Sequence, residues 1–139
     1  MTKIADIMTR SLATVQRDET LQAAARRMKE MDIGALPVLD GKAVAGMVTD
    51  RDITVRGVAA GMVPQESLVA DVMTAEVRCC GVDDSVEQVM AEMGDLQVRR
   101  LPVLDRNNEL VGVLALGDLA TRQSGHTDEA LREISTPDR

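Results

Sequence analysis

The alternation of apolar and polar residues along this chain predicts the same set of elements twice. Residues 19–32 place apolar side chains on one face of a helix, and residues 84–97 repeat that spacing. Each helix is followed by a short apolar run, a polar turn and a second apolar run, which is typical of a β-hairpin. The two apolar stripes consist of Leu21, Ala24, Ala25, Met28 and Met31, and of Val86, Val89, Met90, Met93 and Leu96.

The elements around each hairpin complete a repeating unit. Short strands are expected before the helices, within residues 11–16 and 76–82. Asp18 is expected to cap the first helix, and a second helix is expected after each hairpin, beginning near Asp50 and near Gly117. Each copy then reads β-α-β-β-α, so the fold class is α+β (mixed α/β). A copy of about 60 residues has little core of its own, so the two are expected to bury apolar faces together.

The repetition extends to residue identity. A shift of 65 positions superimposes residues 4–40 on residues 69–105 with 11 identities in 37 positions and no gap. One inserted residue then aligns Gly46 with Gly112 and Asp52 with Asp118. We therefore expect a tandem duplication. Its expected parts are repeat 1 at residues 3–60, a linker at 61–68, repeat 2 at 69–123 and a C-terminal tail at 124–139 that adds a short helix.

Composition narrows the chemistry. The 139 residues include no Phe, Tyr or Trp but nine Met, so the core is aliphatic and a ligand base has no ring to stack on. The net charge of -7 argues against nucleic acid, because duplex binding needs clustered Lys and Arg. Adjacent Cys79 and Cys80, with His126 distant, suit neither a disulfide framework nor a metal site and indicate free thiols. No signal peptide or membrane-length apolar run is present, so a cytoplasmic protein is expected.

The segment Gly46–Asp52, GMVTDRD, has two interpretations. Thr49 and Asp52 have the spacing of a helix capping box, with Gly46 placed where another backbone passes close. Alternatively, a hydroxyl and a carboxylate at a helix start would hold the phosphate and the ribose of a nucleotide. The second copy keeps Asp118 but replaces the hydroxyl with Ala115, which favours a separate role for the acid. A cation held by Asp50 and Asp52 and a catalytic nucleophile–base pair are both weaker interpretations.

These paired motifs resemble a tandem pair of CBS domains, the Bateman module. Two units led by Ile-Met-Thr or Val-Met-Thr, each continuing through Leu-Pro-Val-Leu-Asp to the Thr49–Asp52 segment or its counterpart, carry the likeness over about residues 3–123. The resemblance implies two repeats related by a pseudo-twofold axis, with two clefts between them. It also implies a homodimer formed through the helices, and a regulatory rather than catalytic role. The short form is similar to small bacterial CBS-pair proteins tied to stress responses.

The resemblance also implies the site residues. Asp52 and Asp118 match the ribose-binding acid, and Thr49 matches the hydroxyl on the phosphate side. Arg99 and Arg100 replace Gly34 and Ala35 and either supply phosphate charge or are merely exposed arginines at a strand edge. The cleft linings are Ala13, Thr14, Val15, Ile33, Gly34, Ala35, Leu36 and Pro37 in copy one, and Val77, Arg78, Cys79, Val98, Arg99, Arg100, Leu101 and Pro102 in copy two.

Three functions follow from these expectations. The first is a sensor that binds an adenosine-containing ligand (AMP, ADP, ATP or S-adenosylmethionine) as a regulatory ligand, with no obligatory cofactor or metal, and signals to an unknown protein partner through the dimer. The second is an adaptor with vestigial clefts that works by protein–protein contact. An enzyme is the weakest interpretation. Because one lost hydroxyl–phosphate bond costs about one to two decades of affinity, the Thr49–Asp52 cleft is expected to bind better than the Asp118 cleft.

Overall fold

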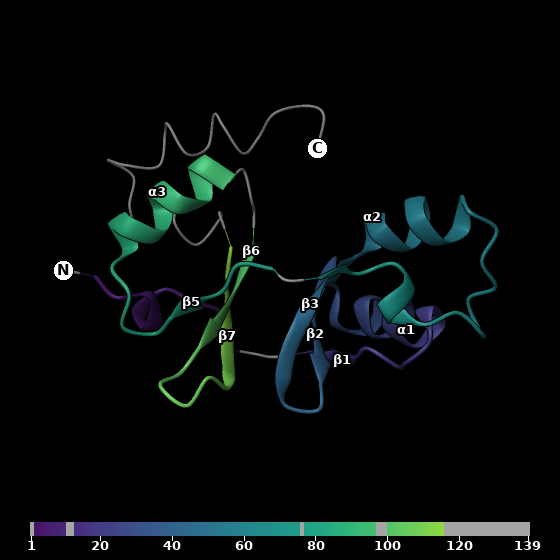
Figure 1. The fold of residues 1–139 in the computed structure, drawn as a ribbon, viewed down its shortest axis with the longest axis horizontal. Coiled ribbons are helices and arrows are strands. Elements are labelled where there is room, and N and C mark those ends of the chain that lie inside the picture. Colours follow the sequence, from purple (N-terminus) through teal and green to yellow (C-terminus); the bar gives the residue numbers. More distant parts are fainter. Residues whose placement is uncertain (1, 11–12, 76, 97–99, 116–139) are drawn as a thin grey trace. The chain divides into compact units, whose positions relative to one another are not determined.

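The structure is a computed structural model, and it describes residues 2–10, 13–75, 77–96 and 100–115 (Figure 1). The chain forms two compact units. Unit 1 contains Met1–Leu12 and Arg78–Arg139, and unit 2 contains Ala13–Val77. Both units are mixed α/β, as the sequence predicts. Among the described residues, no helix combines the length and the apolar character needed to cross a membrane.

Unit 2 is built around a four-stranded sheet with the order β1-β2-β3-β4. The predicted hairpin forms its centre, and β1 pairs with β2 in parallel while β4 pairs with β3 antiparallel. A helical segment beginning at Asp50 follows the hairpin, which confirms the position predicted for the second helix of this copy. The elements are β1 (Val15–Gln16), α1 (Leu21–Met31), β2 (Ala35–Asp40), β3 (Ala43–Thr49), α2 (Asp50–Asp52), the π-helix η2 (Ile53–Val58), the 3-10 helix η3 (Val69–Asp71) and β4 (Thr74–Ala75).

Unit 1 repeats this plan with a three-stranded sheet in the order β5-β6-β7. Thr9 forms an isolated antiparallel bridge with Val113 of β7. This bridge corresponds to the pairing of β4 with β3 in unit 2. Both hairpins carry a register shift at equivalent positions, Val38/Leu39 and Val103/Leu104. The second helix expected near Gly117 and the tail helix expected in 124–139 lie outside the described residues. The elements are η1 (Ile4–Asp6), β5 (Cys80–Gly81), α3 (Val86–Leu96), β6 (Arg100–Leu104) and β7 (Leu110–Ala115).

The predicted cap of the first helix is wrong. Thr20, not Asp18, precedes α1, and its side chain accepts a hydrogen bond from the backbone N of Ala23 at 3.1 Å. Ser85 makes the same contact with Gln88 N at 3.2 Å before α3. A cap must sit directly before the first helical residue to reach these amides, and Asp18 lies two residues too early.

The apolar stripe of α1 is narrower than predicted. Leu21, Ala24 and Met28 are buried, but Ala25 and Met31 are exposed. In α3 the stripe begins as predicted, with Val86, Val89 and Met90 buried, whereas the side chains of Met93 and Leu96 lie outside the described set. The buried residues follow one line along each helix, which is what a helix packed against a small sheet needs.

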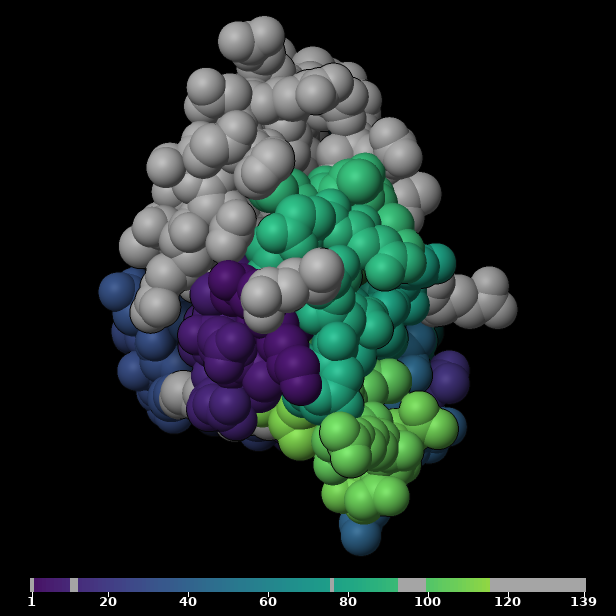
Figure 2. Space-filling model, turned by 90° about the vertical axis from the view of Figure 1, so that its left-hand side faces the viewer, coloured from purple at the N-terminus to yellow at the C-terminus, as the bar shows by residue number. Residues whose placement is uncertain are grey.

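The leading segment of each repeat packs into the core formed by the other repeat's strands. Ile4, Ile7 and Met8 belong to the unit 1 core with Leu101 and Leu114. Figure 2 shows residues 2–10 (purple) against the segment from β5 into α3, where Ile4 N donates to Asp84 O at 3.1 Å. In unit 2 the equivalent residues Val69 and Val72 join the core of Val15, Leu21, Leu36, Val38 and Val48. The compact units therefore cut across the sequence repeats.

Gly46 and Gly112 allow these segments to approach. A Cβ on Gly46 would collide with the carbonyl oxygen of Thr74 in β4, because the two backbones touch. A Cβ on Gly112 would lie 2.6 Å from Met8 Sδ and 2.9 Å from Thr9 O. This confirms that Gly46 is a strand glycine at a close backbone approach.

Candidate functional site

The predicted site residues of copy one gather at one end of the unit 2 sheet. Antiparallel pairing sets Ala35 opposite Thr49 and Pro37 opposite Met47. Parallel pairing of Val15 with Val38 brings the residues before Val15 to the same end, because parallel strands begin at the same edge. We call this region the Thr49 end; its residues are Ala13, Thr14, Gly34, Ala35, Thr49, Asp50 and Asp52.

Thr49 and Asp52 form the capping box. Thr49 Oγ1 accepts from Asp52 N at 3.0 Å, and Asp52 Oδ2 accepts from Thr49 N at 3.0 Å. The carboxylate is well covered, with 16% of the Asp52 side chain exposed. Asp52 Oδ1 lies 3.9 Å from Arg56 Nε, which is an ion-pair contact beyond hydrogen-bond length.

The capping box leaves part of each side chain's bonding capacity for a ligand. A hydroxyl both donates and accepts, and a carboxylate accepts on two oxygens. In the described part of the chain the Thr49 hydroxyl donates to no protein group, and Asp52 Oδ1 accepts no hydrogen bond. One donor and one acceptor are thus presented side by side. Capping and ligand binding are compatible, so the two sequence interpretations do not exclude each other.

The other predicted lining residues differ in what they offer. Val15 and Leu36 are 1% and 0% exposed and belong to the core, and Pro37 is also buried. The side chains of these three residues are therefore not available to a ligand. Ala13, Thr14, Gly34 and Ala35 are half-buried, and Ile33 is 38% exposed.

Asp50 is a member of this site whose place the sequence did not reveal. Its N donates to Gly34 O at 2.9 Å, and its Oδ1 accepts from Arg51 N at 2.8 Å. A Cβ on Gly34 would lie 3.1 Å from Asp50 Oδ2. Glycine is therefore the residue that leaves room for this carboxylate. The sequence indicates Asp50 only as a weak candidate for a cation ligand beside Asp52, not as a contact of Gly34.

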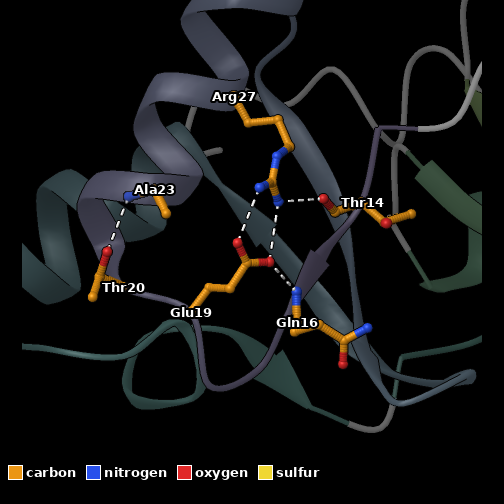
Figure 3. Close-up of polar contacts among 6 residues, drawn as sticks. All are labelled: Thr14, Gln16, Glu19, Thr20, Ala23 and Arg27. Atoms are coloured by element: carbon orange, nitrogen blue, oxygen red, sulfur yellow. Dashed lines mark hydrogen bonds and ion pairs between the residues drawn. The ribbon is translucent and has the colours of Figure 1, made fainter.

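Arg27 and Glu19 are a second pair that the sequence did not reveal. Arg27, on α1, donates to Thr14 O at 2.6 Å and makes paired bonds of 3.0 and 3.1 Å to the Glu19 carboxylate (Figure 3). Glu19 Oε2 also accepts from Gln16 N at 2.8 Å. Arg27 lowers the pKa of Glu19 and Glu19 raises the pKa of Arg27, chiefly through these side-chain hydrogen bonds. Opposite charges eight residues apart give no recognisable sequence pattern.

The equivalent end of unit 1 is only partly described. Arg100 pairs with Ala115, and Leu101 and Pro102 are buried beside them. Arg100 is exposed at the start of β6. Three predicted residues of this copy, Val98, Arg99 and Asp118, lie outside the described residues. Val77 and Cys79 are half-buried, and Val77 falls within the range of unit 2.

The adjacent thiols have different environments. Cys80 is 6% exposed in the unit 1 core, and its burial, aided by the negative charge of Asp84, raises its pKa to about 12. Burial also raises the pKa of Cys79, while Arg78 opposes the shift. Thiolates are the reactive form, so both residues are poor nucleophiles at neutral pH.

We expect Cys80 to resist alkylation by iodoacetamide at pH 8, because its buried thiol stays protonated there. In 6 M guanidinium chloride both cysteines should react at similar rates, which provides the control. Labelling followed by mass spectrometry measures this. Rapid modification of Cys80 in the folded protein would contradict the burial described here.

Metal binding receives no support from the described residues, since no three His, Cys, Asp or Glu side chains there lie close enough together to hold an ion.

Comparison with known proteins connects this arrangement to one family. The model of the CBS domain family matches residues 4–57 and 69–125. The chain is 42% identical over 137 residues to the CBS domain-containing protein YhcV of Bacillus subtilis, covering 97% of this chain and 96% of that protein. It is 37% identical over 127 residues to Hypoxic response protein 1 of Mycobacterium tuberculosis, covering 91% and 88%.

Solved structures agree with the fold. The crystal structure of Hypoxic Response Protein I with two coordinated zinc ions superimposes with a TM-score of 0.78 at 37% identity, covering 87% of this chain and 98% of that chain. Two more distant structures share the fold alone. They are CBSX2 in complex with AMP (TM-score 0.73, 23% identity, coverage 87% and 95%) and the CBS domain pair of protein MJ0100 with 5'-methylthioadenosine and S-adenosyl-L-methionine (TM-score 0.77, 22% identity, coverage 90% and 98%).

Proposed function

The chain belongs to the CBS domain family as a tandem pair, and on that premise we propose that it is a regulatory module that binds an adenosine-containing ligand at the Thr49 end of unit 2. AMP, ADP, ATP and S-adenosylmethionine are the candidate ligands. The ligand acts as a signal rather than as a cofactor, and the protein is not an enzyme. We further propose a cytoplasmic homodimer whose ligand-dependent shape is read by a protein partner, with a stress response as the setting.

The observation that carries this proposal is the pairing of a donor and an acceptor at the Thr49 end. Asp52 Oδ1 is positioned to accept from a ribose hydroxyl, and the Thr49 hydroxyl is positioned to donate to a phosphate or a second ribose oxygen. The capping box fixes both side chains before a ligand arrives, so little ordering cost remains on binding. AMP and S-adenosyl-L-methionine in the two distant CBS structures support the choice of ligand class.

An adaptor role is the second candidate, and one observation favours it. Val55, Val58 and Val63 of unit 2 are 48%, 59% and 48% exposed. Exposed apolar side chains that gather on one segment are typical of protein contact surfaces. Without aromatic residues the protein barely absorbs at 280 nm, so a 260 nm band in purified material would reveal a retained nucleotide. A flat spectrum, together with no heat from AMP, ADP or ATP in calorimetry, would favour the adaptor.

Asp52→Asn is expected to weaken ligand binding about 10- to 100-fold. The amide oxygen can still accept from Thr49 N and so retain the capping geometry, but the position of Oδ1 then holds an NH2 group, which cannot accept from a ribose hydroxyl. Isothermal titration calorimetry with AMP and ADP measures the change.

Asp71→Asn provides the matched control, because Asp71 Oδ2 accepts from Leu68 N at 3.0 Å in an equivalent cap and Asp71 is not one of the residues that define the Thr49 end. The Asp71→Asn variant should bind AMP and ADP with the same affinity as the wild type. Loss of binding in Asp118→Ala, with binding retained in Asp52→Ala, would show that the second copy holds the better site and would refute our ranking.

A further inference from the structure

The guanidinium of Arg27 joins α1 to the backbone on both sides of Val15. It donates to Thr14 O directly, and it holds Glu19, whose Oε2 accepts from Gln16 N (Figure 3). The three side-chain contacts of Arg27 are 2.6, 3.0 and 3.1 Å long. About one third of each side chain is exposed, so the pair is partly shielded from solvent. Bidentate Arg–carboxylate pairs are geometrically specific, so this contact fixes position as well as charge.

The segment held in this way needs such a contact. β1 is only two residues long, and its paired residues are Val15 and Gln16. Gln16 is further tied to Gly41 by two hydrogen bonds of 3.0 Å through its side chain. Thr14 precedes the paired residues, and Arg27 anchors its carbonyl to the helix. Rotation of the peptide between Thr14 and Val15 would break that bond, so Arg27 opposes it.

In unit 1 the position equivalent to Arg27 carries a residue of opposite charge. A shift of 65 places Glu92 at the position of Arg27, and Arg78 donates to Glu92 at 2.6 Å. Asp84 keeps the role of Glu19, since its Oδ2 accepts from Gly81 N at 2.8 Å. An ionised carboxylate only accepts hydrogen bonds, so Glu92 cannot hold the carbonyl of Cys79 as Arg27 holds that of Thr14. At this position the two units therefore differ in charge and in the hydrogen bonds that the side chain can make.

We propose that Arg27 is a positioning residue that makes the Thr49 end selective for adenine over hypoxanthine. This inference rests on the proposed ligand site and on the Ala13–Val15 segment bordering the base. Arg27 takes one lone pair of the Thr14 carbonyl and leaves the other. Adenine presents an amino donor beside a ring acceptor, whereas hypoxanthine presents a carbonyl acceptor beside an N–H donor. A carbonyl held facing the 6-position accepts from the amino group of adenine but opposes the oxygen of hypoxanthine, whereas a carbonyl free to turn can accept from the N–H of hypoxanthine instead.

The test compares AMP with IMP by calorimetry on the full chain. In Arg27→Gln we expect the ratio of AMP affinity to IMP affinity to fall by about tenfold, because the Thr14 peptide can then turn toward either base. Arg27→Lys keeps the charge but loses the planar guanidinium that makes the paired hydrogen bonds. It is the milder variant and should give an intermediate ratio of AMP affinity to IMP affinity. Arg106→Gln removes an exposed ion pair of unit 1, the one with Asp83, and should leave the ratio unchanged.

Hydrogen exchange without ligand provides an independent readout. Arg27→Gln should accelerate exchange at the amides of residues 14–16 at least tenfold while β2 and β3 keep their protection. Equal weakening of AMP and IMP binding would show a merely structural residue and overturn the inference. Unchanged exchange at residues 14–16 would overturn it as well. A wild type that binds neither nucleotide would refute the proposed function and the selectivity together, and exchange would then still show whether Arg27 fixes the segment.

Discussion

Replacing Ile4 with alanine is expected to destabilise the second repeat of the chain rather than the first. Ile4 is fully buried among Val86, Val89, Leu101 and Leu114, all of which belong to the second sequence repeat. Truncating a buried isoleucine to alanine costs about 2–5 kcal/mol through lost burial and the cavity left behind. Hydrogen exchange should therefore speed up in α3, β6 and β7, whereas α1, β2 and β3 keep their protection.

Val69→Ala provides the reciprocal experiment. Val69 occupies the position of Ile4 in the second repeat, and it is fully buried among residues of the first. Its truncation should open α1, β2 and β3 instead. Ile33→Ala is the control for the residue type, since Ile33 is 38% exposed and its loss should change stability by about 0.5 kcal/mol or less. If each substitution weakened its own repeat, the crossed packing would be wrong.

Gly46→Ala is expected to lower the free energy of unfolding by about 3 kcal/mol. The new methyl group would overlap the Thr74 carbonyl oxygen and lie 3.1 Å from its carbon and 3.2 Å from Ala75 Cα. All three atoms belong to the backbone of β4, so no side chain can rotate away to relieve the overlap. Overpacking of this kind costs about 1–3 kcal/mol when neighbours shift, and here a paired strand must move. Urea unfolding followed by circular dichroism measures the change.

Gly112→Ala offers a graded comparison for this prediction. Its nearest neighbour is the side-chain sulfur of Met8, which can move, although Thr9 O at 2.9 Å cannot. The loss should be smaller than for Gly46. Ala43→Val, at an exposed position of the same strand as Gly46, should change stability little. A Gly46→Ala protein as stable as the wild type would mean that β4 does not pair so closely with β3 at Gly46.

Much of the fold follows from local pattern. The hairpins and the two helices were predictable because alternation and helical spacing depend on neighbours in sequence. Gly46 was predictable as a close-approach glycine because a glycine inside a strand often marks a place where another backbone passes close. The cap of α1 was misassigned because Asp18 and Thr20 both have side chains that are favoured at an N-cap. Only the register of the first turn decides which of them is used.

The crossed packing was not predictable from one sequence. A duplication shows which residues are equivalent, but it does not show whether Ile4 packs on its own repeat or on the other. The Thr49 end was anticipated through motif resemblance, whereas Arg27 was not. Arg27 lies on a helix, and its partner atoms are the backbone of Thr14 and a carboxylate eight residues earlier. Contacts to backbone carbonyls depend on tertiary geometry and leave no trace in residue type.

The crossed segments also affect the order in which the chain matures during synthesis. Thr9 pairs with Val113, so the leading segment is made about 100 residues before its partner strand. At about 5–20 residues per second the ribosome needs roughly 5–20 s to bridge that gap. Unit 2 is complete once residue 77 has emerged, but Ile4, Ile7 and Met8 must remain without their core until β7 follows. During that interval these apolar side chains are open to chaperones and to misfolding.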